Sequence, residues 1–204
     1  MMESLKIKPE SWRTYVQAYQ ACASFADDMI GRVIDALDQS SYRDNTIIVL
    51  WSDHGFHLGE KEHFEKFALW EKTNHVPFII IAPGVTSPGS VENIPVDLSV
   101  IYPTLSELCG LPVPDVDGTS LVPLLQNRPM QLGPALSTYG KGNHALRTDR
   151  WRYIRYADGS EELYDHSSDP DEYTNLALQA VYRTLMDSLA QFLPVNEADQ
   201  VPDL

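Results

Sequence analysis

Two short apolar runs, residues 46–51 (TIIVLW) and residues 76–82 (VPFIIIA), constrain the fold of this chain most strongly. Both are rich in β-branched and aliphatic residues, which is typical of strands buried on both faces. The connection between them, residues 55–75, is long, charged and rich in aromatic side chains. A crossover of this length favours parallel strands, whose carboxyl ends gather functional side chains. The two runs therefore predict an α/β fold.

An amphipathic helix is predicted before the first run, because apolar residues recur at helical spacing through residues 11–39. Only two clear central strands precede residue 130, which is few for a doubly wound sheet. We therefore expect residues 1–130 to be part of a larger α/β domain, and residues 131–204 to form a small antiparallel subdomain with a terminal helix. The remaining predicted elements are a helix over residues 97–109, a short helix within residues 120–126, a strand over residues 135–139, a hairpin of residues 151–156 and 161–164, and a helix over residues 173–192.

Charge and cysteine content narrow the possible partners and the compartment. The chain has 15 basic and 29 acidic residues, a net charge of −14, so we expect neither nucleic acid nor an anionic membrane as a partner. No run approaches the roughly 20 apolar residues of a membrane span, and the first residues lack the apolar core of a signal peptide. Cys22 and Cys109 match no metal-binding spacing, and their apolar context predicts two buried free thiols.

The segment Ser52-Asp53-His54-Gly55 follows directly on the first apolar run. A carboxylate there emerges at the end of a strand, where ligand crevices form in open α/β sheets. Gly55 allows a turn, so that Asp53 and His54 could approach one ion. The Asp oxygen suits Ca²⁺ or Mg²⁺, whereas the His nitrogen favours a transition metal. An Asp-His pair at the end of a strand is a structural turn or cap at least half of the time.

The connecting segment, residues 55–75, holds several lysines among aromatic side chains. An ammonium group in such a segment can neutralise a sulfate or phosphate oxygen. A solvated charged helix with an aromatic inner face is the other interpretation of the same pattern. The lysines are Lys61, Lys66 and Lys72.

Residues 46–84, TIIVLWSDHGFHLGEKEHFEKFALWEKTNHVPFIIIAPG, resemble the type I sulfatases of the alkaline-phosphatase superfamily, and look closest to the iduronate-2-sulfatase branch. Three further blocks agree in the same order, and the likeness covers roughly residues 12–193. The blocks are YVQAYQACASFADDMIGRVIDALD, VDLSVIYPTLSELCGLPVPDVDGTSLVPLL and RTDRWRYIRYADGSEELYDHSSDPDEYTNLA. The resemblance implies the C-terminal part of an alkaline-phosphatase-like α/β sandwich, followed by a small antiparallel sheet with a terminal helix.

The resemblance also implies a function, the metal-dependent hydrolysis of sulfate monoesters, with a sulfated small molecule or glycan as substrate. In that family the residues matching Asp53 and His54 bind a divalent cation, usually calcium. The family's sulfate-contacting catalytic lysine aligns with Lys66 and not with Lys61. His144, on a predicted loop of the second subdomain, is a further candidate for substrate binding. His75 lies either at the pocket rim or against a loop carbonyl.

Several parts of the family's active site have no match in this sequence. The family's nucleophile is a formylglycine made from the cysteine of a C-x-P-x-R or C-x-A-x-R motif, but Cys22 begins CASFA and Cys109 begins CGLPV. The only Asp-Asp pair, Asp27-Asp28, lies in the predicted helix and not on a first strand. We therefore expect a truncated chain that binds metal weakly and does not turn over alone, with the formylglycine on a missing N-terminal part.

Three rival interpretations stay open at this stage. A phosphodiesterase or phosphonate hydrolase of the same superfamily would use the same metal and lysine. A non-catalytic module could instead dock with a separate N-terminal chain, or the gene model could be incomplete. The compartment is unknown, although members of the family are often exported.

Three further expectations concern the C-terminal part. The arginines of residues 147–155 alternate with aromatic side chains, which predicts one solvated face of a strand. The acidic run of residues 165–172 predicts a capped turn into the last helix. The tail, residues 196–204, is expected to be disordered.

Overall fold

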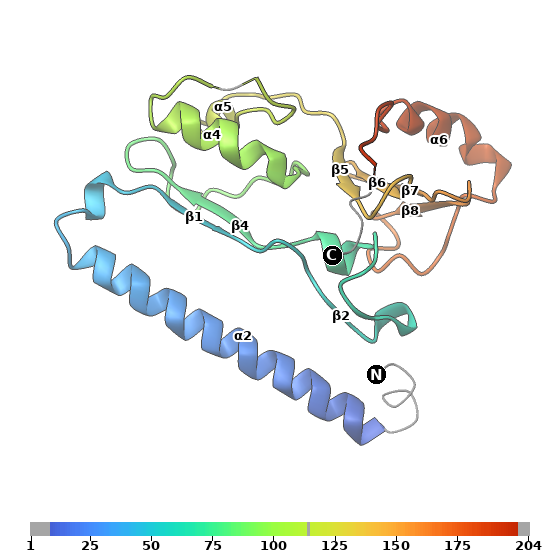
Figure 1. Ribbon diagram of the computed structural model, residues 1–204, viewed down its shortest axis with the longest axis horizontal. Helices are drawn as coiled ribbons and strands as arrows, with labels where there is room; N and C mark the ends of the chain where they lie inside the picture. The colour runs from blue at the N-terminus through green and yellow to red at the C-terminus, as the bar shows by residue number, and fades with distance from the viewer. Residues whose placement is uncertain (1–8, 114, 200–204) are drawn as a thin grey trace.

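The computed structural model describes residues 9–113 and 115–199. Figure 1 shows three parts: the long helix α2, a pair of strands with α4 on the side opposite α2, and a separate sheet covered by α6. Helix α2 runs from Pro9–Asp38, which confirms the helix predicted for residues 11–39. Within the described ranges, no helix is both long enough and apolar enough to cross a membrane. Most of the predicted N-terminal lead-in and the last residues of the tail, 200–204, lie outside those ranges.

The two apolar runs form strands β1 (Ile48–Trp51) and β4 (Phe78–Ile81), which pair with each other and with no other described strand. They are antiparallel, with Val49 opposite Ile80, so the predicted parallel arrangement is wrong. The physical reason lies in the connection, whose one α-helix, α3 (Glu71–Asn74), has four residues. Such a helix is too short to carry the chain back along the sheet to the start of a parallel strand.

The prediction that both strands are buried on both faces is also wrong for this chain. Trp51, Ile79 and Ile81 are 48%, 49% and 46% exposed. A pair of strands has two open edges, and the described residues cover it only in part. The connection itself contains the short antiparallel strands β2 (His57–Leu58) and β3 (Phe64–Glu65), joined by the 3₁₀ turn η2 (Glu60–Glu62).

The helix predicted for residues 97–109 and the short helix predicted within residues 120–126 are both present. A 3₁₀ turn η1 (Arg43–Asn45) follows α2, and η3 (Leu98–Val100) leads into α4 (Ile101–Leu108). Gly110, with φ +67°, ends α4, because a left-handed conformation there suits glycine. Helix α5 (Val122–Leu125) is tied to α4 by the fully buried Thr104, whose hydroxyl accepts the amide of Leu121 at 2.9 Å.

The C-terminal sheet has four antiparallel strands in chain order, β5 (Ala135–Thr138), β6 (His144–Arg147), β7 (Trp151–Arg155) and β8 (Glu161–Asp165). The predicted strand and the predicted hairpin are therefore confirmed. One face packs on η4 (Ala180–Tyr182) and α6 (Arg183–Ala190). The core of this unit consists of Leu146, Tyr153, Leu163, Met186, Leu189 and Leu193.

The last helix begins later than the predicted residue 173. Side chains hold the segment ahead of it in another conformation. The Asp169 carboxylate accepts the main-chain amides of Tyr173 and Thr174, and the side-chain oxygen of Asn175 accepts the amide of Leu163 in β8. Such local side-chain bonds offer the backbone an alternative to the helix. Within the predicted disordered tail, Glu197 accepts the amide of Gly142 at 2.6 Å, so that part is anchored.

Helix α2 is only partly covered by the described chain. Its first turns pack on the β2–β3 hairpin, where Trp12 donates to the carbonyl of Leu58 at 2.6 Å. Further along, Phe25 and Val33 are 66% and 70% exposed. Cys22 lies on this uncovered length, and Cys109 follows the end of α4; both thiols are free and exposed. The predicted burial of the two cysteines is therefore wrong.

Candidate functional site

Asp53 and His54 lie together where the chain leaves β1. The Oδ2 atom of Asp53 is 3.7 Å from Nε2 of His54, and the Asp53 side chain is 81% exposed. The other ring nitrogen of His54, Nδ1, lies 2.8 Å from the carbonyl oxygen of Gly55. Because a carbonyl only accepts, Nδ1 is the nitrogen that donates here, and Nε2, on the side of Asp53, is the nitrogen left to bind a metal.

The turn at Gly55 is built against α3. The amides of Gly55 and Phe56 donate to the carbonyls of Thr73 and Lys72 at 2.8 and 2.9 Å. A Cβ atom on Gly55 would lie 2.1 Å from the carbonyl oxygen of Lys72, so no other residue fits without movement of α3. The direction in which Asp53 and His54 leave the strand therefore depends on the position of α3.

The Asp53–His54 pair fits a cation. Protein ligands lie about 2.0–2.6 Å from zinc or calcium, so two ligand atoms 3.7 Å apart can share one ion. A carboxylate oxygen and an imidazole nitrogen form a donor set that several divalent metals accept. Calcium takes about six to eight ligands, so the pair is only part of such a set.

The three lysines of the connecting segment have different surroundings. The Nζ atom of Lys61 donates to the Glu172 carbonyl at 2.6 Å and to the Tyr164 hydroxyl at 2.9 Å, and lies over the Trp70 ring. Burial lowers the pKa of Lys61, although nearby carboxylates act in the opposite direction. Lys72 pairs with Asp171 at 3.0 Å. The ammonium groups of Lys61 and Lys72 therefore have structural partners.

Lys66 is exposed and differs from the other two. Among the described residues its ammonium has no hydrogen-bond or ion-pair partner, and it lies 5.7 Å from the centre of the Phe67 ring. The preceding residue, Glu65, has φ +74°, and Lys61 and Glu62 also have positive φ. Left-handed backbone costs about 1–2 kcal/mol per non-glycine residue, and such strain gathers at functional segments. Lys66 is the lysine of this segment that is available to an anion.

The histidines of the chain do not join the Asp53–His54 pair. His57 is 1% exposed and packs edge-on against His63 and Trp70, and burial lowers the pKa of both histidines. His75 is exposed and lies 3.2 Å from Glu71. His144 begins strand β6 and does not lie on the predicted loop.

His144 is 3% exposed and held on both sides of its ring. Its Nδ1 lies 2.9 Å from the Thr138 hydroxyl, and its Nε2 lies 3.2 Å from Oε2 of Glu197. In this conformation both ring nitrogens face protein groups.

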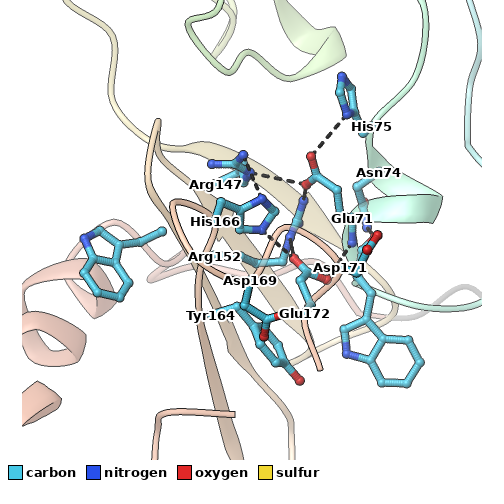
Figure 2. Close-up of polar contacts among 12 residues, drawn as sticks. Glu71, Asn74, His75, Arg147, Arg152, Tyr164, His166, Asp169, Asp171 and Glu172 are labelled. Carbon is cyan, nitrogen blue, oxygen red and sulfur yellow. Dashed lines mark hydrogen bonds and ion pairs between the residues drawn. The ribbon is translucent and has the colours of Figure 1, made fainter. Parts of the chain in front are cut away.

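A buried ion-pair cluster joins the connecting segment to the C-terminal sheet (Figure 2). Arg152 is 2% exposed; its guanidinium pairs with Glu71 and, at 2.5 Å, with Glu172, which is 1% exposed. His166 lies 2.9 Å from Glu172, and Arg147 lies 3.3 Å from Glu71. The predicted solvated arginine face is therefore wrong at Arg152, because residues of the connecting segment cover that side of β7.

Three members of this cluster, Glu71, His166 and Glu172, offer ligand atoms within 4.8 Å of one another, the spacing of a metal site. Arg152 already neutralises both carboxylates. Burial alone would raise the pKa of Glu71, but Arg152 and Arg147 outweigh it and hold that pKa below its usual value. The cluster is therefore an ion-pair network. Glu172 also shows that the acidic run of residues 165–172 is more than the predicted capped turn.

An Asp–His pair that can share one cation and an exposed lysine thus lie on part of a mixed α/β domain. Sequence profiles make the class specific: the Sulfatase profile matches residues 4–111, and the profile of the C-terminal part of N-sulphoglucosamine sulphohydrolase matches residues 59–199. The chain belongs to the sulfatase family.

Individual relatives agree with this family. A sulfatase of Formosa agariphila is 45% identical over 194 residues, which is 94% of this chain and 38% of that protein. Human arylsulfatase K is 36% identical, over 79% of this chain and 33% of that protein. The chain thus spans well under half the length of these relatives. They support the family, and not the iduronate-2-sulfatase branch in particular.

Solved structures give the same fold over part of their length. The protein BT4656, solved with its substrate D-glucosamine-2-N,6-O-disulfate, matches with a TM-score of 0.80 and 31% identity, over 88% of this chain and 40% of that one. The phosphonate monoester hydrolase of Silicibacter pomeroyi matches with a TM-score of 0.72 and 28% identity, over 81% of this chain and 37% of that one.

Proposed function

We propose that this chain carries the metal- and sulfate-binding half of an active site that hydrolyses sulfate monoesters, R–O–SO₃⁻, to an alcohol and sulfate. The observation that carries the proposal is the combination of an open Asp53–His54 pair with a free Lys66. Lys61, the competing lysine, already donates to Tyr164 and Glu172. A sulfated sugar is the proposed substrate class, supported by the disulfated glucosamine bound to BT4656.

Each residue has a role in this proposal. Asp53 and His54 hold a divalent cation, Ca²⁺ or a similar ion, which supplies charge neutralisation at the sulfate oxygens. Lys66 binds the sulfate group and stabilises the negative charge that builds up in the transition state. The Gly55 carbonyl keeps the proton on Nδ1 of His54, so that Nε2 stays a ligand. His144 is a candidate substrate contact once its ring is released from Glu197.

A segment outside this sequence completes the site in the proposal. It supplies the formylglycine nucleophile, because neither Cys22 nor Cys109 lies in the family motif. Large apolar side chains left exposed on α2 and on the β1–β4 pair support such a partner, since exposed apolar surface marks binding faces. They are Phe25 and Val33 on α2, and Trp51, Ile79 and Ile81 on the two strands.

A second candidate function is phosphonate ester hydrolysis, favoured by the match to a phosphonate monoester hydrolase. The same metal ligands and lysine serve a phosphonate as well as a sulfate. The nucleophile distinguishes the two: a cysteine in C-x-P-x-R supports sulfate chemistry, and threonine or serine supports phosphoryl transfer. A third candidate, a non-catalytic docking module, requires that no such nucleophile segment is encoded nearby.

The experiment begins with the DNA directly upstream of Met1 and of neighbouring genes. The protein that unites this chain with a nucleophile segment is then assayed against an aryl sulfate and an aryl phosphonate in parallel. Asp53→Asn and Lys66→Ala should each lower kcat/KM for the sulfate by about a hundredfold or more. Lys141→Ala, an exposed lysine paired with Asp199, is the control and should change little. Full activity in both site variants would contradict the proposal.

A further inference from the structure

The connecting segment that carries Lys66 is attached to the C-terminal sheet through side chains. Trp70 donates its indole N–H to Glu162 at 2.7 Å, and Lys61 donates to the Glu172 carbonyl at 2.6 Å. Leu69 is buried against Ala145, Ile154 and Tyr164 on the face of the sheet opposite α6. The segment thus depends for its position on residues more than seventy positions later in the chain.

Arg152 lies at the centre of this attachment (Figure 2). One guanidinium nitrogen donates to the Leu69 carbonyl at 3.2 Å, another pairs with the Glu71 carboxylate, and Nε lies 2.5 Å from Glu172. The second oxygen of Glu172 accepts the amide of Glu71 at 2.8 Å. Arg152 and Glu172 together therefore fix the first residue of α3, its side chain through the guanidinium and its main-chain amide through the Glu172 carboxylate.

The position of α3 in turn fixes the metal-binding turn. The carbonyls of Lys72 and Thr73 accept the amides of Phe56 and Gly55, and the absence of a side chain on Gly55 leaves the two segments in direct contact. A displacement of α3 would move Gly55, and with it the adjacent His54. Arg152 is thus connected to His54 through Glu71, α3 and Gly55 by hydrogen bonds, an ion pair and covalent bonds alone.

We infer that Arg152, held by Glu71 and Glu172, is a positioning residue for the Asp53–His54 metal pair, acting from the C-terminal sheet through α3 and the Gly55 turn. This inference rests on the proposed function, which makes the pair a metal site. Arg152 touches neither the metal nor the substrate in this arrangement. Its effect is to keep the two ligands on one side of the turn.

The test uses the full chain, with Tb³⁺ as the probe for the cation site and tryptophan-sensitised emission as the signal. Arg152→Met should weaken Tb³⁺ affinity by about tenfold or more, and emission lifetimes in H₂O and D₂O should show more bound water. The matched control is Arg150→Met, whose arginine lies immediately before β7, is 57% exposed and pairs with Asp165. It should leave affinity within about twofold.

A second measurement separates local positioning from loss of fold. Hydrogen exchange of the Gly55 and Phe56 amides should speed up in Arg152→Met by a larger factor than exchange of the paired β1 and β4 amides. Glu71→Gln keeps the side-chain shape, so it replaces Arg152→Met if that variant does not fold, with the same expected outcomes. Unchanged Tb³⁺ affinity and unchanged Gly55 exchange in a folded variant would overturn the inference.

Asp53→Asn distinguishes failure of the inference from failure of the proposed function. If Asp53→Asn leaves Tb³⁺ binding intact, the metal assignment fails, and the exchange of Gly55 alone then decides whether Arg152 positions the turn. If Asp53→Asn abolishes binding and Arg152→Met does not weaken it, the metal assignment stands and the inference about Arg152 is wrong.

Discussion

The Nε atom of Arg152 lies 2.5 Å from Oε1 of Glu172, and the two side chains are 2% and 1% exposed. Two charges so deeply buried are stable only while each neutralises the other. The pair joins β7 to the loop after β8, and through Glu71 it reaches the segment that carries the candidate site.

Removing Arg152 alone should destabilise the chain strongly. Arg152→Met leaves the Glu172 carboxylate buried without its guanidinium, and we expect the free energy of unfolding in urea to fall by about 3–5 kcal/mol. The double variant Arg152→Met with Glu172→Gln should lose less, because no buried charge is stranded at Glu172. Arg150→Met should lose less than Arg152→Met, because Arg150 is 57% exposed and Ser167 still donates to the Asp165 carboxylate. This account would be contradicted if the loss in the double variant equalled the sum of the losses in Arg152→Met and in Glu172→Gln.

Replacing Lys61 should lower the stability of the chain more than replacing Lys66. Lys61→Met leaves the Glu172 carbonyl and the Tyr164 hydroxyl without their donor, so the free energy of unfolding should fall by about 1–3 kcal/mol. Lys66→Met should change it by less than about 0.5 kcal/mol, because its ammonium is exposed. Urea unfolding at neutral pH measures both. Equal losses would show that Lys66 has a structural partner.

Two glycine-to-alanine substitutions should change the free energy of unfolding in opposite directions. Gly55→Ala forces a Cβ atom against the Lys72 carbonyl, and we expect a loss of about 1–3 kcal/mol in the free energy of unfolding. Gly31 lies within α2 with nothing inside 4 Å of its added Cβ. Gly31→Ala should therefore stabilise by about 0.5–1 kcal/mol through helix propensity. Thermal unfolding of the two variants checks the signs, and a neutral Gly55→Ala would mean that α3 moves freely.

The buried His57 should make stability depend on pH. Burial lowers the pKa of His57 in the folded state, so folding favours the neutral ring. Its stabilising contribution is present above the unfolded pKa of about 6.5 and is lost as the pH falls toward the folded pKa. The free energy of unfolding should therefore fall between about pH 7 and pH 5, and less steeply in His57→Phe, which keeps the ring contacts.

Urea unfolding of the unsubstituted chain and of His57→Phe across the same pH range measures the two slopes. Burial also lowers the pKa of His63, so part of the slope should remain in His57→Phe. An unchanged slope in His57→Phe would show that His57 already has a proton acceptor in the folded state.

The sequence by itself determined the local elements and the family. Helical spacing was sufficient for α2, the β-branched runs for β1 and β4, and Asp158-Gly159 for the β7–β8 hairpin, because these patterns are set by neighbours along the chain. The linked motifs around Asp53, His54 and Lys66 were sufficient for the sulfatase family.

Only the tertiary structure decided how these elements meet. It made β1 and β4 antiparallel, left Cys22 and Cys109 exposed, and buried Arg152 against Glu71 and Glu172. Alternation along β7 shows that Arg152 and Tyr153 face opposite sides, but not that the connecting segment covers the arginine side. Burial depends on which distant segment packs on a face. The ion pairs that join residue 152 to residues 71 and 172 leave no periodic pattern in the sequence around any of the three.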